Sequence, residues 1–375
     1  MDFALTVEQA TIQEAFRRLV DRKITPNASA IDEAAEFPTE AFQAVGAMGF
    51  FGMRYPEDVG GVGLDCQTYC LAVEELARGS LSVAAACTMQ SLMGTWFLYR
   101  SGNEWIRNEY FTPALAGDKI GTICFTEPGA GSDLGSMGTT AVEDGGDWVL
   151  SGQKTWITSA PVADFFTVWA KTGERDLAPF LVPRETPGLV VGKSIPKMGV
   201  RASVTSEVFF EECRVPADHR LADPAEGRRH LEEILGKIRL MTAALAIGAG
   251  RGALEAAVAY AGERVQFGKP IGAFQAVKMR LADMATELEA ARRLMQYAAW
   301  REDRGLDNRK EASMAKLFAS EAGMKVCDGA SRVLASYGYA EEYPVERHLR
   351  DVRFTLIGGG TSEILKLIIG KELLR

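Results

Sequence analysis

Apolar residues recur at helical spacing in the first third of the chain and again over its last 150 or so residues. The segment EQATIQEAFRRLV (8–20) has this spacing, and CLAVEELARG (70–79) ends at a glycine, a frequent helix terminator. Beyond Pro270 the steps of three and four continue for several turns, which predicts a long helix with one buried face. The residues of this stripe are Phe274, Val277, Leu281, Met284, Leu288, Ala291, Leu294 and Ala298. Long helices of this kind usually pack into a bundle.

The middle of the chain instead shows short β-prone runs punctuated by Pro and Gly. TTAVEDGGDWVLSG (139–152) predicts a hairpin around a Gly-Gly turn. Further runs are DKIGTICFTEP (118–128), FFTVWAK (165–171), PFLVP (179–183), GLVVG (188–192) and SEVFFEECRVP (206–216). We therefore expect an α+β protein with a helical domain over 1–118, a β-barrel or sandwich domain over 119–222 and a helical bundle over 223–375.

The composition argues against a nucleic-acid-binding protein, a membrane protein and a metal-binding protein. The 375 residues are 47% hydrophobic and 25% charged, as in a folded globular protein, and the net charge is −8. An acidic chain without Lys/Arg runs is not expected to bind nucleic acid. We expect no membrane span, because we find no apolar run of sufficient length, and the N-terminus lacks a basic signal region, so a cytoplasmic location is expected. The six cysteines lack metal-ligand spacing, so we expect buried thiols and no metal site.

Two glycine-rich stretches resemble dinucleotide fingerprints. IGAGRGA (247–253) fits G-x-G-x-x-G/A, but helical residues precede it, so we interpret it as close helix packing. GAGSDLG (129–135) lies among β-runs without a following helix pattern, which disfavours a Rossmann domain.

Six segments together resemble the acyl-CoA dehydrogenase family, in its order and spacing across essentially the whole chain. They are CFTEPGAGSDLGSM (124–137), GQKTWITSA (152–160), KMGVRASVTSEVFFEECRVP (197–216), ERVQFGKPIGAFQ (263–275), YGYAEEYPVERHLRD (337–351) and GGTSEILKLIIGKEL (359–373). The resemblance implies the acyl-CoA dehydrogenase fold: an N-terminal helical domain, a central β domain and a C-terminal four-helix bundle. It also implies one FAD per subunit and a homo-oligomer, with a tetramer expected.

By the same resemblance, Thr126 and Thr158 would hydrogen-bond the flavin ring and Trp156 would pack against it, while Ser132 would contact FAD or the thioester. The other implied cofactor contacts lie in the same motifs and are Phe125, Gly131, Arg264, Gln266, Phe267, Gln275, Thr361 and Glu363. Of these, a neighbouring subunit would supply Arg264, Gln266 and Phe267. The implied substrate contacts are Ser132, Arg239, Thr88 and Ser91.

The catalytic glutamate of the family is missing. Most members carry it immediately before the Gly-Thr of the last motif, where this chain has Gly359 with only its backbone N–H to offer. A minority carry it immediately before an arginine of the bundle's first helix, and here Ile238 precedes Arg239. Ala84 stands where relatives that bind a second carboxylate have an arginine, which disfavours a glutarate-like acyl group.

The leading hypothesis is a FAD-dependent oxidoreductase that performs α,β-dehydrogenation of an acyl thioester, or a variant of it, with a non-standard or missing base. A specialised flavoenzyme is the alternative: a carrier-protein-tethered acyl dehydrogenase, a decarboxylating desaturase or a flavin monooxygenase. A non-catalytic FAD- or acyl-binding protein is the third. Expected partners are an acyl-CoA or acyl-carrier-protein thioester, and an electron-transfer flavoprotein or O2 as acceptor.

Overall fold

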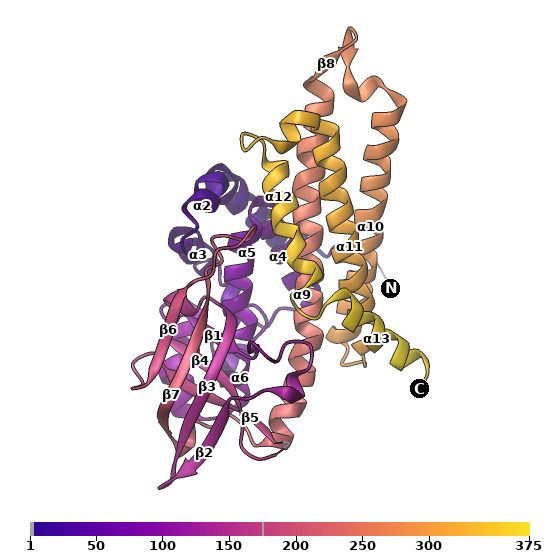
Figure 1. The fold of residues 1–375 in the computed structure, drawn as a ribbon. Coiled ribbons are helices and arrows are strands. Elements are labelled where there is room, and N and C mark those ends of the chain that lie inside the picture. The colour runs from indigo at the N-terminus through magenta and orange to yellow at the C-terminus, as the bar shows by residue number, and fades with distance from the viewer. Residues whose placement is uncertain (1–3, 175) are drawn as a thin grey trace.

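The computed structural model describes residues 4–174 and 176–375, and its N-terminal part is a layer of short helices (Figure 1). Helix α1 begins with a capping box, in which Thr6 Oγ1 accepts the Gln9 N–H at 3.1 Å and the Gln9 side chain accepts the Thr6 N–H at 3.1 Å. The predicted helices over 8–20 and 70–79 are confirmed. The helices of this part are α1 (Val7–Leu19), α2 (Ala28–Ala34), α3 (Thr39–Gly46), α4 (Cys66–Gly79), α5 (Leu81–Thr88), α6 (Trp96–Arg100), α7 (Glu104–Ile106) and α8 (Thr112–Ala116).

The segment Leu81–Arg100 corrects one expectation. Within its 20 residues an 18-residue window has a mean hydropathy of 1.2, so by length and composition alone the segment could cross a membrane, contrary to our reading of the sequence. However, 89% of the apolar window is buried inside the protein. Core helices of folded proteins meet the same criterion, so the segment is weak evidence for a membrane span and is better explained as core.

A seven-stranded sheet follows, with strand order β1-β4-β2-β3-β7-β6 and β5 paired to β4. The predicted hairpin is confirmed: β2 and β3 pair antiparallel, and Gly145 and Gly146 turn between them at φ 63° and 91°, values that favour glycine. Each of the other predicted runs contains a strand. The strands are β1 (Gly121–Cys124), β2 (Thr140–Asp144), β3 (Asp147–Thr158), β4 (Phe165–Lys171), β5 (Leu177–Pro183), β6 (Leu189–Ser194) and β7 (Thr205–Pro216).

The C-terminal part is a bundle of long helices that stands beside the N-terminal layer and extends above it (Figure 1). It consists of α9 (Pro224–Glu263), α10 (Gln275–Asp303), α11 (Arg309–Leu334), α12 (Pro344–Val352) and α13 (Ser362–Leu373), with a small hairpin of β8 (Val265–Gln266) and β9 (Lys269–Pro270) between α9 and α10. The stripe predicted beyond Pro270 is confirmed, because Met284, Leu288, Ala291 and Ala298 are buried and the stripe's other members are partly buried.

The glycines of IGAGRGA pack helices and do not bind a dinucleotide, as expected. All lie inside α9, where a Cβ on Gly248 would stand 2.4 Å from the Glu74 carbonyl oxygen and one on Gly252 would stand 2.6 Å from that of Arg78. Only glycine allows α9 to approach α4 this closely. The six cysteines are free and buried, as the sequence predicted.

Candidate functional site

The loop between β1 and β2 and the end of β3 form one wall of the site. The Thr155 N–H donates to the Thr126 carbonyl at 2.8 Å, and Thr122 Oγ1 donates to the Thr158 carbonyl at 2.6 Å. These bonds place the two predicted flavin contacts Thr126 and Thr158 on neighbouring segments. Trp156, between them in sequence, has a left-handed backbone with φ 58°, and 56% of the residue is exposed.

This wall fits a flavin ring. Among the residues that the structure describes, the hydroxyls of Thr126, Thr158 and Ser132 make no hydrogen bond. A Cβ on Gly131 would meet no atom within 4 Å, so the loop there is open. An exposed indole beside unengaged hydroxyls is unusual on a free surface, and a planar heterocycle with acceptors at its edge would satisfy both. Phe125 lies behind this surface, with its ring 5.4 Å from that of Trp169.

A buried ion pair supports the loop, and the sequence did not point to it. Lys154 Nζ donates to Glu127 Oε1 at 2.8 Å and to the Phe125 carbonyl at 3.2 Å. Burial would raise the pKa of Glu127, but its hydrogen bonds from Lys154 and from the Gly138–Thr139 segment outweigh burial and lower that pKa to about 2. Burial lowers the pKa of Lys154, which opposes the pairing. We interpret the pair as ionised, because the Glu127 carboxylate also accepts the backbone N–H groups of Gly138 and Thr139.

The turn before α13 brings the two empty base positions together. Gly359 and Gly360 have φ of 71° and 97°, a conformation that favours glycine. A Cβ on Gly359 would lie 3.3 Å from Ile238 Cγ2 and 3.0 Å from Thr242 Oγ1, both on α9. Thus the residues at the two alternative base positions face each other, and neither is a carboxylate. Thr242 carried no recognisable signal in the sequence, since only the fold brings α9 against this turn.

The Gly359 N–H is available to a ligand. In residues 4–174 and 176–375, no backbone or side-chain acceptor takes it. Thr361 is the N-cap of α13, where its Oγ1 accepts the Ile364 N–H at 3.3 Å, and Glu363 is exposed in the first turn. The predicted acyl-pocket residues Thr88 and Ser91 are buried, and their hydroxyls donate to the Ala85 and Thr88 carbonyls at 3.2 and 3.4 Å. Whether either also contacts substrate stays a prediction.

The remaining predicted cofactor residues lie elsewhere. Arg264, Gln266, Phe267 and Gln275 are exposed on and beside the β8–β9 hairpin, which Figure 1 shows at the end of the bundle remote from the sheet. The Arg264 guanidinium lies 5.7 Å from the centre of the Tyr337 ring, and Phe267 is 92% exposed. The same chain therefore does not bring these residues to its own flavin wall, in keeping with the expected contribution to a neighbouring subunit.

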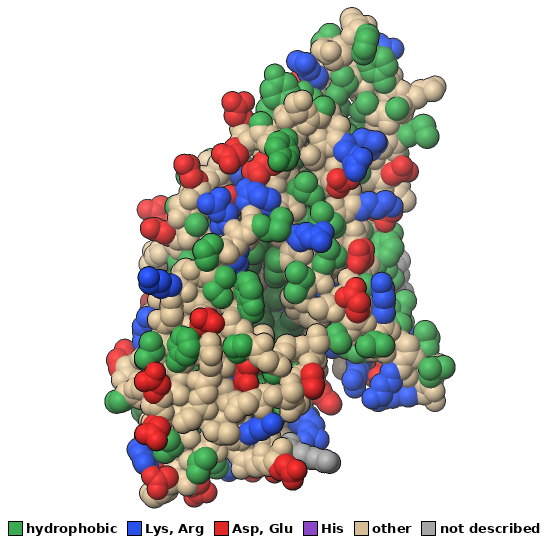
Figure 2. Space-filling view, viewed as in Figure 1, with side chains coloured by type: hydrophobic (Ala, Val, Ile, Leu, Met, Phe, Trp, Pro, Cys, Tyr) green, Lys and Arg blue, Asp and Glu red, His purple; other side chains and the backbone are tan. Residues whose placement is uncertain are grey.

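Figure 2 shows this face of the molecule hollowed between the sheet and the C-terminal helices, with hydrophobic side chains in the hollow.

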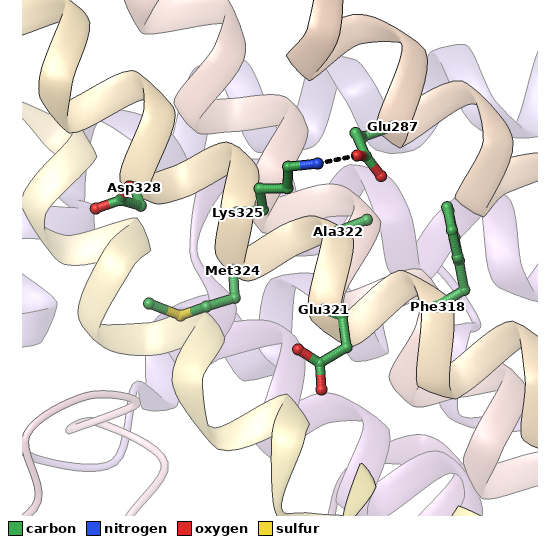
Figure 3. Close-up of a pocket in the computed structure, with 7 residues that line it drawn as sticks. All are labelled: Glu287, Phe318, Glu321, Ala322, Met324, Lys325 and Asp328. Atoms are coloured by element: carbon green, nitrogen blue, oxygen red, sulfur yellow. Dashed lines mark hydrogen bonds and ion pairs between the residues drawn. The ribbon is translucent and has the colours of Figure 1, made fainter. Parts of the chain in front are cut away.

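A separate groove of about 480 Å³ lies on α10 and α11 (Figure 3). Three carboxylates line it, and its one lysine, Lys325, already pairs with Glu287. An acidic lining opposes the phosphates of CoA or FAD, so this groove is not the candidate site.

Comparison with known proteins matches all three parts of the chain. Family models for the N-terminal, middle and C-terminal domains of acyl-CoA dehydrogenase match residues 6–118, 122–213 and 225–374. Benzylmalonyl-CoA dehydrogenase of Aromatoleum aromaticum is 59% identical over 374 residues, which cover 99% of each chain. Among solved structures, butyryl-CoA dehydrogenase of Megasphaera elsdenii has a TM-score of 0.96 and 34% identity over the full length of both chains. A glutaryl-CoA dehydrogenase of Mycobacterium smegmatis in complex with FADH2 has a TM-score of 0.94 and 33% identity, covering 98% of this chain and 95% of that one.

Proposed function

The chain belongs to the acyl-CoA dehydrogenase family, and we propose that it oxidatively decarboxylates an acyl-CoA that carries a carboxylate on its α-carbon. As a family member it is a flavoprotein oxidoreductase whose cofactor is FAD. The name of the benzylmalonyl-CoA relative specifies a substrate of this class, a 2-substituted malonyl thioester. We extend that class, with an aromatic substituent on the β-carbon, to this chain.

The observation that carries the proposal is the facing pair Gly359 and Ile238. A dehydrogenase that removes an α-proton needs a base beside the α-carbon, and such a base contributes about 10²–10⁴-fold to rate. Here the nearest side-chain atoms to position 359 are a methyl group of Ile238 and the hydroxyl of Thr242. A substrate that loses CO2 from its α-carbon needs no base, because the broken C–C bond leaves the electron pair there. The empty position then provides room for the departing carboxylate.

The reaction balances without a protein base. The bond between the α-carbon and the carboxylate breaks, CO2 departs, and the electron pair forms the α,β double bond as the β-hydrogen leaves as hydride. Bound FAD would supply the acceptor for that hydride, which carries the two electrons of the oxidation. The product is an α,β-unsaturated acyl-CoA, one carbon shorter than the substrate.

The residues of the chain would bind and orient the thioester and the flavin. The free Gly359 N–H is suited to donate to the thioester carbonyl, which withdraws electrons from the α-carbon. Trp156 and the hydroxyls of Thr126 and Thr158 would hold the flavin against the same hollow. Ser132, on the open loop, would contact FAD or the thioester arm.

A matched pair of substrates tests the proposal. 2-Benzylmalonyl-CoA and 3-phenylpropionyl-CoA differ only in the α-carboxylate. Mixed anaerobically with holoenzyme, the first should bleach the flavin and release one CO2 per flavin reduced. The second should reduce it about 100-fold or more slowly, because no base removes its α-proton. Bleaching at equal rates, or bleaching without CO2, would show that the protein supplies a base and would overturn the proposal.

The assembly and the compartment are part of the same proposal. The exposed hairpin residues Val265 and Phe267, 52% and 92% exposed, are suited to a subunit interface at which Arg264 and Gln266 reach a neighbour's FAD. We propose a homotetramer, or a dimer, in the cytoplasm, where six free cysteines are compatible with the reducing conditions. An electron-transfer flavoprotein is the proposed acceptor, with O2 as the alternative. A FAD-loaded monomer in sedimentation would refute the shared site.

A further inference from the structure

Arg239 is a buried cation without a partner. It follows Ile238 on α9 and is 7% exposed, and its Nε atom is fully buried with no hydrogen-bond acceptor. In the part of the chain that the structure describes, no ion pair or hydrogen bond involves the Arg239 side chain. Two other largely buried arginines have carboxylate partners: Arg54 pairs with Glu302 at 3.6 Å, and Arg292 pairs with Glu74 at 2.8 Å. Arg347, 5% exposed, donates to Ser29 Oγ at 2.8 Å. A buried guanidinium is costly unless an anion compensates it.

A second buried cation lies close to it. Lys316 on α11 is fully buried, and its Nζ donates to the Gly360 carbonyl at 2.6 Å. Burial, together with the charge of Arg239, lowers the pKa of Lys316 to about 8, although Glu321 and Glu363 oppose the shift. Burial and the charge of Arg309 lower the pKa of Arg239 to about 10. Two mutually repelling cations therefore lie around the glycine turn.

The nearby carboxylates compensate these two cations only in part. Glu321 accepts a hydrogen bond from Ser362 Oγ at 2.7 Å, and Glu363 is exposed at the start of α13. Neither is within 4 Å of a nitrogen of Arg239 or Lys316, since no ion pair forms among these four described residues. In most of the family, by the resemblance of the motif, position 359 would add a carboxylate at this turn; here it is glycine. An anionic group of a ligand would supply the negative charge that the turn lacks.

We propose that Arg239, supported by Lys316, forms the subsite that binds the α-carboxylate of the substrate. The inference rests on the proposed function and deepens it, because it names the residue that selects a malonyl-type thioester. Lys316 connects Arg239 to the glycine turn, because its Nζ donates to the Gly360 carbonyl and the charge of Arg239 acts on it. A guanidinium recognises a carboxylate with two parallel hydrogen bonds, which would orient the C–CO2 bond.

The role is recognition and orientation, and it involves no new covalent step. A charge-assisted hydrogen bond to the carboxylate is made before CO2 leaves and is lost afterwards. It therefore strengthens substrate binding and selects against thioesters without the carboxylate, more than it lowers the barrier itself. Arg239 is in this sense a specificity-determining residue.

Malonyl-CoA and acetyl-CoA are the probes, because they differ only in the carboxylate and neither has a β-hydrogen to transfer. Calorimetric titration of the FAD-loaded protein should show a preference for malonyl-CoA. Arg239→Met should reduce that preference by at least about tenfold, the loss expected for a charge-assisted hydrogen bond, by weakening malonyl-CoA binding far more than acetyl-CoA binding. Arg239→Lys should retain part of the preference. Arg229→Met is the matched control, because Arg229 also lies on α9 but its side chain is 60% exposed and pairs with Glu226 at 3.3 Å, and it should retain the full preference.

Thermal melting supplies a second readout. Arg239→Met removes an unpaired buried charge, so the substrate-free holoenzyme should melt at the same or a higher temperature. Marked destabilisation, equal weakening of both probes, or a wild type without preference would overturn the subsite. If 2-benzylmalonyl-CoA releases no CO2 while the Arg239-dependent preference persists, the proposed reaction is wrong and the subsite is upheld. If 2-benzylmalonyl-CoA releases CO2 but the Arg239-dependent preference is absent, the proposed reaction is upheld and the subsite is wrong.

Discussion

By the family resemblance, substituting Gly359 by glutamate restores the catalytic side chain of most members. The variant distinguishes two hypotheses: an ordinary dehydrogenase that has lost its base, and a pocket adapted to a substrate with an α-carboxylate. The backbone there has φ 71°, so any side chain adds strain of about 1 kcal/mol. A Cβ would lie 3.0 Å from Thr242 Oγ1 and 3.3 Å from Ile238 Cγ2, so these neighbours must shift by a few tenths of an ångström. We therefore expect Gly359→Glu to fold, to bind FAD and to melt a few degrees below the wild type.

The effect on activity should be much larger than the effect on stability. The introduced carboxylate would occupy the space proposed for the α-carboxylate of the substrate. Two carboxylates about 4 Å apart repel by about 4 kcal/mol at the effective dielectric constant of a partly buried site, which corresponds to about three orders of magnitude in binding or rate. Conversely, a base beside the α-carbon should accelerate oxidation of 3-phenylpropionyl-CoA, up to the 10²–10⁴-fold that a well-positioned base provides.

The assay is the anaerobic rate of flavin bleaching by 2-benzylmalonyl-CoA and 3-phenylpropionyl-CoA, with Gly359→Ala as the matched control. Alanine adds the same Cβ and backbone strain without the charge. Turnover of 2-benzylmalonyl-CoA should fall about 100-fold or more in Gly359→Glu and much less in Gly359→Ala. If glutamate and alanine have the same effect, charge and lost space are not the cause and the reasoning is refuted. Brisk bleaching of the wild type by 3-phenylpropionyl-CoA would refute it too.

Three further predictions concern the cofactor, its loop and the fold. The purified protein should be yellow and release FAD, not FMN, on denaturation, and a colourless protein that fails to take up FAD contradicts the flavin wall around Trp156. Lys154→Met leaves the Glu127 carboxylate buried without its cation, so the free energy of unfolding should fall by about 3 kcal/mol and FAD should bind more weakly. Adding Glu127→Gln should restore part of the stability and part of the FAD affinity. Equal losses in the single and double variants would argue against a stabilising Lys154–Glu127 ion pair. Burial raises the pKa of Asp351 to about 7, so the folded state binds the extra proton and wild-type stability should fall as pH rises from about 4 to 7, by about 4 kcal/mol at most. Asp351→Asn can still accept the Val200 N–H and should flatten that decline in chemical denaturation; an unchanged pH profile would show that Asp351 is ionised throughout.

Local patterns in the sequence predicted the elements well, because their signals are periodic and short-range. The stripe beyond Pro270 and the Gly-Gly hairpin depend on residues a few positions apart, and the structure confirms both. The segment Leu81–Arg100 was harder, since length and hydropathy do not separate a membrane span from a buried core helix. Only the packing around it distinguishes them.

The site depended on contacts that no local pattern contains. Lys154 and Glu127 are 27 positions apart, and Lys316 meets Gly360 across 44 positions. Motif order predicted a flavin loop and two base positions without a carboxylate, but it could not show that Ile238 and Gly359 face each other. Nor could it show that Arg239 lacks a partner, because a lone arginine in a helix is usually solvated. Whether a buried arginine has an anionic partner depends on the residues that the fold places around it. Here the lack of such a partner for Arg239 led us to propose a negatively charged substrate group.

The missing carboxylate and the unpaired cations are most simply explained together. If the site had decayed after losing its base, the loop that holds the flavin should have deteriorated as well. Instead the Lys154–Glu127 pair, the three free hydroxyls and the exposed indole of Trp156 are all in place. A retained buried charge is also hard to explain by decay, because replacing Arg239 with an apolar residue would relieve its desolvation. Selection for a substrate that brings its own carboxylate accounts for both: the protein gives up the glutamate that would repel this carboxylate and keeps the guanidinium that attracts it.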